Sequence, residues 1–200
     1  EHKHVCYLPH TVDTKVFKKI ENEEDVLERR REGFRNLDNV TDRTIFFWNN
    51  RNARRKQSGS LIFWFKKFLD EVGHDKATLL MHTDPKDVHG QDLEYIVHHL
   101  GLDQGQVFLS KHKVDPEHLS AMYNICDCTI SVSDAEGFGL ATLESLSCET
   151  PIIATMTGGL QEQVTDGENW FGIGIEPTSK AIIGSQEIPF IYEDRLSEEV

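Results

Sequence analysis

The sequence predicts an α/β fold: a doubly wound parallel sheet of about six strands, with helices on both faces. Two observations support this prediction. From residue 44 onward, short apolar runs alternate with longer amphipathic stretches, which is typical of β-α-β units. Each apolar run is four or five residues long and nearly uninterrupted, as expected for a strand that is covered by helices on both sides.

The elements follow in chain order. Residues 1–43 are predicted to be a lead-in segment, and its charge-rich stretch from Glu21 to Arg35 predicts a solvated helix. Residues 44–200 are predicted to be the main domain. Its strands are predicted from the apolar runs at residues 44–48, 77–81, 106–109, 128–132, 151–154 and about 171–175. Its helices are predicted from the intervening stretches at about 58–72, 91–100, 116–126, 140–149 and 159–165. The tail contains a strand-like IPFIY and an acidic end that reads as the first turn of a helix.

Composition narrows the classes of partner. The 200 residues include 34 Asp and Glu against 21 Lys and Arg, a net charge of −13, which is unsuited to broad neutralisation of nucleic-acid phosphates. No apolar run approaches the roughly 18 to 20 residues of a membrane span, and residues 1–20 lack a signal-peptide core. Four cysteines without the spacing of a small disulfide scaffold predict buried thiols and no disulfides. A reducing, cytoplasmic location is therefore expected.

A basic loop follows the first predicted strand. Open parallel sheets bind ligands at the carboxyl ends of their strands, so the loops there are the places to look for chemistry. Four cations fall within six residues of this loop: Arg51, Arg54, Arg55 and Lys56. They would make a suitable counter-charge for a diphosphate, although a solvated basic loop fits the charge pattern equally well.

A glycine-containing turn leads from the strand at 128–132 into a helix. Gly137 and Gly139 allow backbone N–H groups to approach a ligand closely, and the start of a helix favours an anion. The turn is not a dinucleotide-binding fingerprint, because Thr142 stands where the third glycine would be needed. A single phosphate group is the ligand that this turn suits best.

Two glutamates bracket that turn, Glu136 before the glycines and Glu144 inside the helix. Their spacing alone is weak evidence. Glu144 lies about 40° from Leu140 on a helical wheel, at the border of the apolar stripe. A carboxylate placed there can accept two vicinal hydroxyls, as the ribose-binding acid of nucleotide folds does, or it can be a half-exposed surface residue.

The remaining polar motifs carry less information. Gly158 and Gly159, after the strand at 151–154, suit either close approach of a ligand or close packing. None of the ten histidines forms an H-E-x-x-H motif or pairs with a cysteine at a zinc spacing, so no metal site is predicted. Cys126 and Cys128 are expected to be buried core thiols.

Taken together, residues 107–169 resemble the C-terminal, donor-binding domain of the retaining glycosyltransferases with the GT-B fold, a Rossmann-like unit that forms one half of that fold. The E-x7-E signature of the family falls on Glu136 and Glu144. Upstream, its Gly-Arg-x4-Lys pattern matches Arg51 and Lys56, and the lead-in YLPHTVDTKVF is similar to the interdomain entry of the family. The resemblance covers roughly residues 5–170.

The resemblance implies roles for these residues. Arg51 and Lys56 would bind the donor diphosphate, Glu144 would hold the ribose and Glu136 the hydroxyls of the transferred sugar. Glu136, Arg51 and Lys56 would be the catalytic residues. The loop at residues 110–114, which includes Val114, would face the base. The backbone of the turn would contact the sugar and the phosphates, at Gly137, Phe138, Gly139 and Leu140. No cofactor is expected, because the nucleotide-diphosphate sugar is a co-substrate. No metal is expected either.

The sequence also departs from the family pattern. Asn50 stands where the family has the glycine before its arginine, His82 and Thr83 stand where it usually has glycine, and residues 176–192 do not follow the common pattern. The family's N-terminal acceptor-binding domain has no counterpart in residues 1–200. That domain and an acceptor, which would be a sugar, a lipid or a protein glycan, are therefore expected partners, and the isolated chain is expected to be inactive.

Other functions stay open. A GT-B epimerase or phosphorylase would share the site, and a nucleotide-sugar-binding module would use it without turnover. A glycoside hydrolase fits less well, because Glu136 and Glu144 would have to face each other across a sugar ring. The sequence does not predict the base, the sugar or the acceptor.

Overall fold

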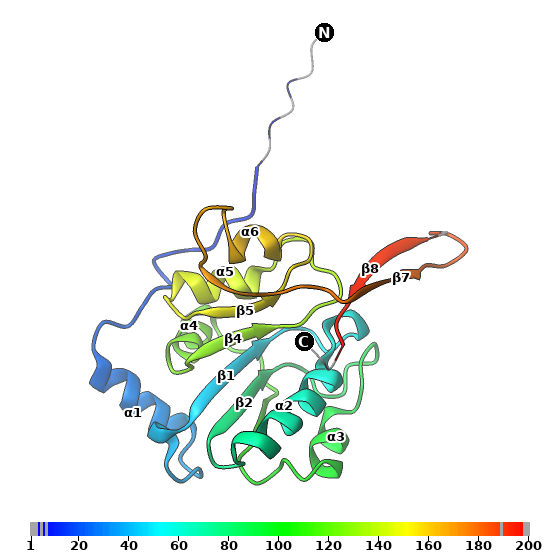
Figure 1. Cartoon of the computed structure of the whole chain (residues 1–200). Helices are drawn as coiled ribbons and strands as arrows, with labels where there is room; N and C mark the ends of the chain where they lie inside the picture. The colour runs from blue at the N-terminus through cyan, green and yellow to red at the C-terminus, as the bar shows by residue number, and fades with distance from the viewer. Residues whose placement is uncertain (1–3, 5, 7, 189, 198–200) are drawn as a thin grey trace.

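In the computed structural model, which describes residues 4, 6, 8–188 and 190–197, six parallel strands form one sheet in the order β3-β2-β1-β4-β5-β6 (Figure 1). The strands are β1 Thr44–Asn49, β2 Ala77–His82, β3 Val107–Ser110, β4 Cys128–Ser131, β5 Ile152–Thr155 and β6 Gly172–Ile175. All six predicted strands and the doubly wound fold class are confirmed. The strand order reverses between β1 and β4, and this reversal is the place where such sheets bind ligands.

Five helices connect the strands: α2 Ser58–Val72, α3 Leu93–His99, α4 Pro116–Asn124, α5 Leu140–Ser147 and α6 Leu160–Val164. Right-handed crossovers place α2 and α3 on one face of the sheet and α5 and α6 on the other (Figure 1). Local capping explains why α3 and α4 begin where they do. The Asp92 side chain accepts from the backbone N–H of Tyr95, and the Asp115 side chain accepts from that of His118.

The lead-in segment packs onto the domain. Phe17, Phe34 and Leu37 are buried in the same apolar cluster as Phe47 of β1, so the core extends upstream of residue 44. The segment includes the helix α1 Glu23–Gly33 and the short 3-10 helix η1 Val40–Asp42.

Helix α1 differs in one respect from the solvated helix that its charges predict. Most of its residues are exposed, but Arg30 is only 7% exposed. Its guanidinium donates to both carboxylate oxygens of Asp127, at 2.9 and 3.0 Å, and the same carboxylate accepts from the backbone N–H of Ile45 at 2.6 Å. One member of the charge run therefore anchors α1 at the start of β1.

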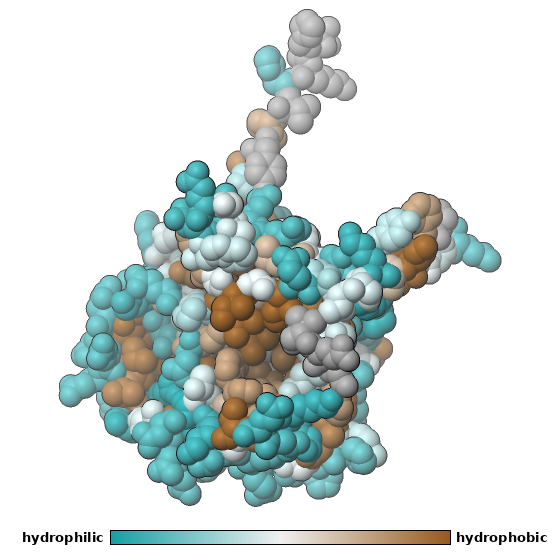
Figure 2. Space-filling model, viewed as in Figure 1, coloured by the Kyte–Doolittle hydropathy of each residue, from teal (hydrophilic) through white to brown (hydrophobic). Residues whose placement is uncertain are grey.

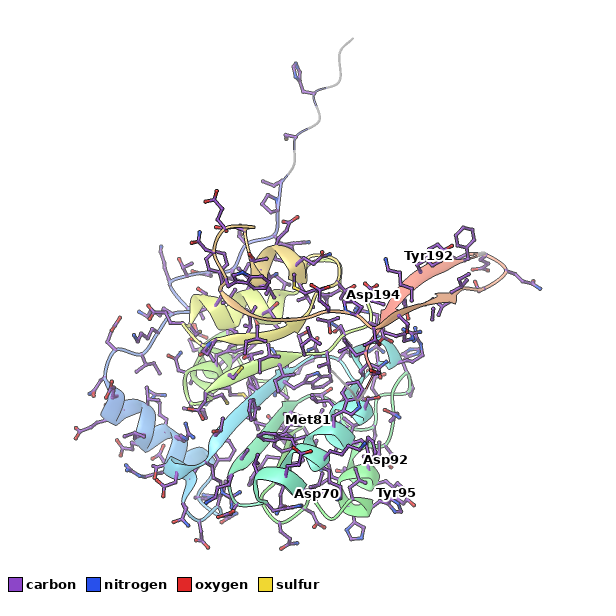
Figure 3. All side chains as sticks on the ribbon, viewed as in Figure 1. Asp70, Met81, Asp92, Tyr95, Tyr192 and Asp194 are labelled. Atoms are coloured by element: carbon purple, nitrogen blue, oxygen red, sulfur yellow. The ribbon has the colours of Figure 1, made fainter. Side chains whose placement is uncertain are left out.

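A β-hairpin projects from the sheet near the C-terminus (Figure 1). Its strands are β7 Ser179–Ile183 and β8 Ile191–Arg195, and they pair antiparallel. The strand-like IPFIY overlaps β8 only at Ile191 and Tyr192, and β7 was not predicted. In the acidic end, which was expected to begin a helix, Glu193 and Asp194 belong to β8 instead. Residues 198–200 of that end lie outside the described residues. Figure 3 shows Tyr192 out along the hairpin and Asp194 at its base.

A buried ion network explains why the acidic end adopts a strand. Asp134, which is 1% exposed, accepts from the side-chain amide of Gln57 at 2.8 Å and from the guanidinium of Arg195 at 2.5 Å. Glu193 accepts from Arg195 at 2.9 Å and from Arg54 at 2.7 Å. The strand conformation thus delivers two side chains of β8 to the loops that follow β1 and β4.

An apolar groove of about 550 Å³ lies beside α2, on the α2 side of the sheet. Figure 2 shows its apolar side chains gathered in a hollow on this face of the molecule. Its lining comes from α2, from β1, β4, β5 and β6, and from the residues that follow β4 and β8; it includes Trp64, Phe68, Ile130 and Ile153. None of the helices in the described part of the chain is long and apolar enough to cross a membrane.

The cysteines are free thiols. Cys126, Cys128 and Cys148 are buried, as the sequence predicts, whereas Cys6 is exposed. Burial raises the pKa of the Cys128 thiol to about 11, so this group is protonated and unreactive at neutral pH.

Candidate functional site

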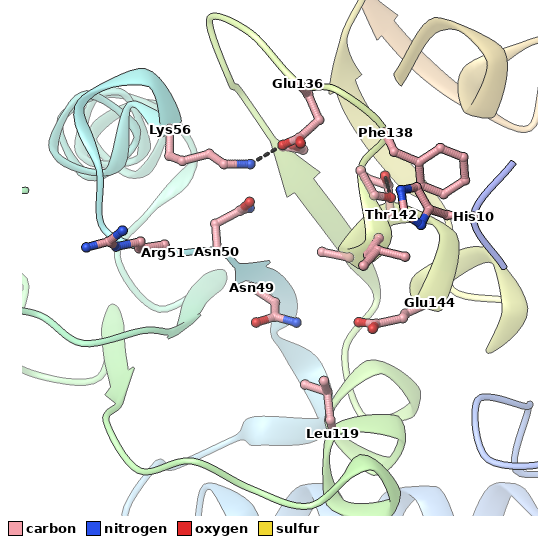
Figure 4. Close-up of a pocket in the computed structure, with 14 residues that line it drawn as sticks. His10, Asn49, Asn50, Arg51, Lys56, Leu119, Glu136, Phe138, Thr142 and Glu144 are labelled. Carbon is pink, nitrogen blue, oxygen red and sulfur yellow. Dashed lines mark hydrogen bonds and ion pairs between the residues drawn. The ribbon is translucent and has the colours of Figure 1, made fainter. Parts of the chain in front are cut away.

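A pocket of about 380 Å³ opens at the carboxyl ends of β1 and β4, where the strand order reverses (Figure 4). Most of the site residues predicted from the sequence line it, namely Arg51, Lys56, Glu136, Phe138, Gly139, Leu140 and Glu144. Gly137 and Val114 are not among the lining residues. Residues far apart in the sequence are therefore brought together at the edge of the sheet that the fold class predicts.

Lys56 and Glu136 form an ion pair on one side of the pocket (Figure 4). Lys56 ends the short 3-10 helix η2 Arg54–Lys56, and only 6% of the residue is exposed. Burial lowers the pKa of its ammonium group, and the hydrogen bond that it donates to Glu136 offsets part of this effect. The pocket thus holds a desolvated cation whose position is fixed by a carboxylate.

Arg51 is held differently. Its guanidinium donates to both carboxylate oxygens of Asp87, at 2.6 and 3.1 Å, and 61% of its side chain is exposed. In Figure 4 it points away from Lys56 and Glu136. The hydrogen bond from Arg51 holds the pKa of Asp87 at about 2, so the carboxylate is ionised at any physiological pH. Arg51 is thus a solvated cation whose orientation is set by the loop after β2.

The basic loop as a whole is not a free counter-charge. Arg54 pairs with Asp134 and Glu193, and Arg55 lies 3.6 Å from Glu136 and donates to the backbone oxygen of Ala135 at 2.6 Å. Neither arginine lines the pocket. Of the four cations of this loop, only Lys56 and Arg51 line the pocket.

Glu144 lies on the other side of the pocket, on α5. It is half-buried, as its place at the border of the apolar stripe predicts. The hydroxyl of Tyr123 donates to its carboxylate at 2.7 Å, and the side-chain amide of Asn49 donates to the oxygen of the same hydroxyl at 2.9 Å. Burial raises the pKa of Glu144, and the hydrogen bond from Tyr123 acts in the opposite direction.

Several residues of the site were not predicted. Asn49 and His10 line the pocket, and the imidazole of His10 packs edge-on against the ring of Phe138 with ring centroids 5.1 Å apart. Asp87 and Tyr123 do not line the pocket but contact residues that do: Asp87 contacts Arg51, and Tyr123 contacts Asn49 and Glu144. No pattern in the sequence signals these four residues, because their partners are distant along the chain. No group of three or more His, Cys, Asp or Glu side chains that could hold a metal ion occurs among the residues described.

Gly158 and Gly159 support the turn that carries Glu136. The backbone N–H of Gly159 donates to the carbonyl of Glu136 at 3.1 Å. A Cβ on Gly158 would lie 1.9 Å from that carbonyl oxygen, and one on Gly159 would lie 2.7 Å from the Cα of Phe138. Neither glycine lines the pocket. Of the two readings of this pair, close packing is the one that the structure supports.

Gly158→Ala is therefore expected to destabilise the fold strongly. The control is Gly167→Ala. Both glycines have a positive φ, +49° at Gly158 and +95° at Gly167, but only at Gly167 is there nothing within 4 Å of the place that an alanine methyl group would occupy. Gly167→Ala should lose about 1 to 2 kcal/mol for the left-handed backbone alone. Gly158→Ala should lose about 2 to 5 kcal/mol, because overpacking against backbone is added. Urea denaturation measures both; equal losses would contradict the packing role.

A doubly wound sheet with a charged pocket at its switch point defines a Rossmann-like ligand-binding domain. The chain belongs to the glycosyl transferases group 1 family, whose model matches residues 30–188. The resemblance to GT-B glycosyltransferases is thereby confirmed.

Individual relatives agree with this assignment. A D-inositol 3-phosphate glycosyltransferase of Corynebacterium urealyticum is 36% identical over 77 residues, which are 38% of this chain and 18% of the relative. The C-terminal domain of the group 1 glycosyl transferase LpcC from Francisella tularensis has a TM-score of 0.64 at 25% identity, and the match covers 84% of this chain and 82% of that domain. Sucrose-phosphate synthase from Thermosynechococcus elongatus has a TM-score of 0.64 at 26% identity, over 84% of this chain and 38% of that enzyme. The chain spans less than half the length of that synthase and of the curated relative.

Proposed function

We propose that this chain is the donor-binding part of a retaining glycosyltransferase that takes its sugar from a nucleotide-diphosphate sugar without a metal ion. The observation that carries the proposal is the pocket at the switch point, with the buried Lys56–Glu136 pair on one side and Glu144 on the other. One side offers charge for a diphosphate and hydroxyl acceptors for a sugar. The other offers a carboxylate for a ribose.

In this proposal catalysis is electrostatic. When the bond between the sugar and the diphosphate breaks, negative charge grows on the leaving phosphate, and Lys56 stabilises it from a fixed, desolvated position. Glu136 accepts from hydroxyls of the transferred sugar, and Arg51, oriented by Asp87, adds charge at the solvent side. These cations supply the charge that a metal ion provides in other transferases. The base-facing role of Val114 and the backbone contacts of Gly137, Phe138, Gly139 and Leu140 belong to the same proposal.

The partners are also part of the proposal. The pocket is open, so these residues form one wall of a cleft, and the second wall would come from an N-terminal domain that binds the acceptor. The free cysteines fit the cytoplasmic location that we propose. We expect the 200-residue chain to bind nucleoside diphosphates and not to transfer sugar; transfer should return when the acceptor domain is supplied. Efficient glycosylation of an acceptor by the chain alone would contradict this division of labour.

Calorimetric titration tests the proposal. UDP, GDP and ADP are each titrated into the chain in the presence of EDTA, and free glucose and mannose are titrated in parallel. We expect one of the nucleotides to bind with one site per chain, with an affinity that EDTA does not change, and the free sugars to show no comparable binding. Binding of free sugar without nucleotide would favour a hydrolase. Loss of nucleotide binding in EDTA would refute metal independence. Nucleotide binding without transfer in the complete protein would favour a binding module.

A further inference from the structure

We propose that Tyr123 is a positioning residue that fixes the carboxylate of Glu144 for the ribose, an inference that rests on the proposed function. Tyr123 lies near the end of α4 and is fully buried. Its ring packs edge-on against Phe47, with centroids 5.0 Å apart, and against Phe17, with centroids 6.3 Å apart. Both neighbours belong to the core, so the ring has no room to swing and its hydroxyl stays at one point beneath the pocket.

The direction of the hydrogen bonds follows from the donors at hand. A tyrosine hydroxyl has one hydrogen and can also accept. The amide of Asn49 donates to its oxygen at 2.9 Å, so the hydroxyl hydrogen is free to point at Glu144, 2.7 Å away. The chain Asn49 to Tyr123 to Glu144 therefore runs in one direction and ends on a carboxylate. It links the end of β1 to α5 through the end of α4.

These two hydrogen bonds hold the carboxylate of Glu144 in place while leaving part of it free for a ligand. The contact from Tyr123 engages one carboxylate oxygen, Oε2, and no other side chain in the described part of the protein donates a hydrogen bond to this carboxylate. The other oxygen remains free to accept from vicinal hydroxyls. A glutamate that is already held in one rotamer loses no further side-chain freedom when the ribose binds. Tyr123 can therefore raise the affinity of the protein for the nucleotide without touching the nucleotide.

The same contact favours the ionised form of the carboxylate and offsets part of the effect of burial. Burial raises the pKa of Glu144, whereas the bond from Tyr123 lowers it. Glu144 contacts Tyr123 from α4, and Cys148, the residue that follows α5, interacts with it electrostatically. Burial raises the pKa of Cys148, so that thiol is neutral at physiological pH. The other charged or titratable side chains that line the same pocket are those of His10, Arg51, Lys56 and Glu136. A hydroxyl-accepting carboxylate works in its ionised form. Ribose recognition should therefore weaken as the pH falls through the pKa of Glu144, and removal of the tyrosine hydroxyl should move this midpoint to higher pH.

Tyr123→Phe tests the inference, because it keeps the packed ring and deletes the hydroxyl. The probes are whichever of UDP, GDP and ADP binds the wild-type chain, and the 2′,3′-dideoxy form of that nucleotide. Tyr95→Phe is the matched control, since Tyr95 is 64% exposed on α3 and does not line the pocket. Calorimetry between pH 5 and 8 should show a roughly three- to tenfold loss of affinity for the ribonucleotide in Tyr123→Phe. The dideoxynucleotide should bind equally to both proteins, and the pH midpoint should rise.

A merely structural role gives a different result. If Tyr123→Phe weakened both nucleotides equally, or neither, the positioning role would be overturned. A double-mutant cycle adds a test within one protein background: once Glu144→Gln is present, Tyr123→Phe should cause no further loss for the ribonucleotide, whereas additive losses would contradict the inference. Failure of the wild-type chain to bind any of the three nucleotides would instead refute the proposed function, so the two failures are distinguishable.

Discussion

Lys56→Ala is expected to weaken binding of the nucleoside diphosphate by roughly 10- to 150-fold, the range for loss of a charge-assisted hydrogen bond of about 1.5 to 3 kcal/mol. The expected loss is large because Lys56 is desolvated and fixed before the ligand arrives. Its removal also leaves the negative charge of Glu136 beside the phosphates, with Arg55 as the nearest remaining cation at 3.6 Å. Calorimetry of the bare nucleotide measures the effect directly.

The control is Lys66→Ala, which removes the same charge from α2, where Lys66 pairs with Asp70 and does not line the pocket. It should leave nucleotide affinity unchanged. Arg51→Ala should give a smaller loss than Lys56→Ala, because the Arg51 side chain is mostly exposed and already engaged by Asp87. A thermal melt of each variant establishes that it is folded. If Arg51→Ala cost more affinity than Lys56→Ala, the phosphate site would lie further toward the solvent than we propose.

Glu144→Gln and Glu136→Gln are expected to separate the two ends of the donor. Glu144→Gln should weaken the bare nucleoside diphosphate by roughly tenfold or more, since a neutral amide is a poorer acceptor for ribose hydroxyls than a carboxylate. Glu136→Gln should leave that affinity nearly intact and weaken only the intact nucleotide-sugar, because we propose that Glu136 binds the transferred sugar.

The comparison is made by calorimetry with the bare nucleotide and by competition with the nucleotide-sugar. Each variant serves as the control for the other, because both replace a carboxylate by an isosteric amide in the same pocket. If Glu136→Gln weakened the bare nucleotide more than Glu144→Gln did, the two roles would be reversed. A modest loss from Glu136→Gln would still be compatible with its contact to Lys56, provided that it stays below the loss from Glu144→Gln.

The sheet was predictable because its determinants are local. Each strand is an apolar run and each connecting helix an amphipathic one, so both could be located from short windows of sequence. The hairpin was not predictable in the same way. Glu193 and Asp194 read as the acidic start of a helix, but Arg54 and Asp134, which are remote in sequence, bind β8 as a strand. Tertiary contacts overrode the local pattern here.

The site shows the same division. Lys56, Glu136 and Glu144 stand in loops and at a helix border that the predicted fold brings to one edge, so a motif could locate them. Tyr123 could not be located, since in sequence it is an apolar residue on a helical stripe. The role that we propose for it depends on a hydroxyl that contacts Glu144, 21 residues away, and Asn49, 74 residues away. The sequence predicts what lies at the pocket more readily than what holds it in place.

The most direct test of the central claim is a crystal structure of the chain with a nucleoside diphosphate bound. We predict that the nucleotide lies across the pocket between β1 and β4, with its phosphates within hydrogen-bonding distance of the Lys56 ammonium and its ribose hydroxyls on the carboxylate of Glu144. A nucleotide bound outside this pocket, or one whose ribose lies at Lys56 and whose phosphates lie at Glu144, would contradict the account.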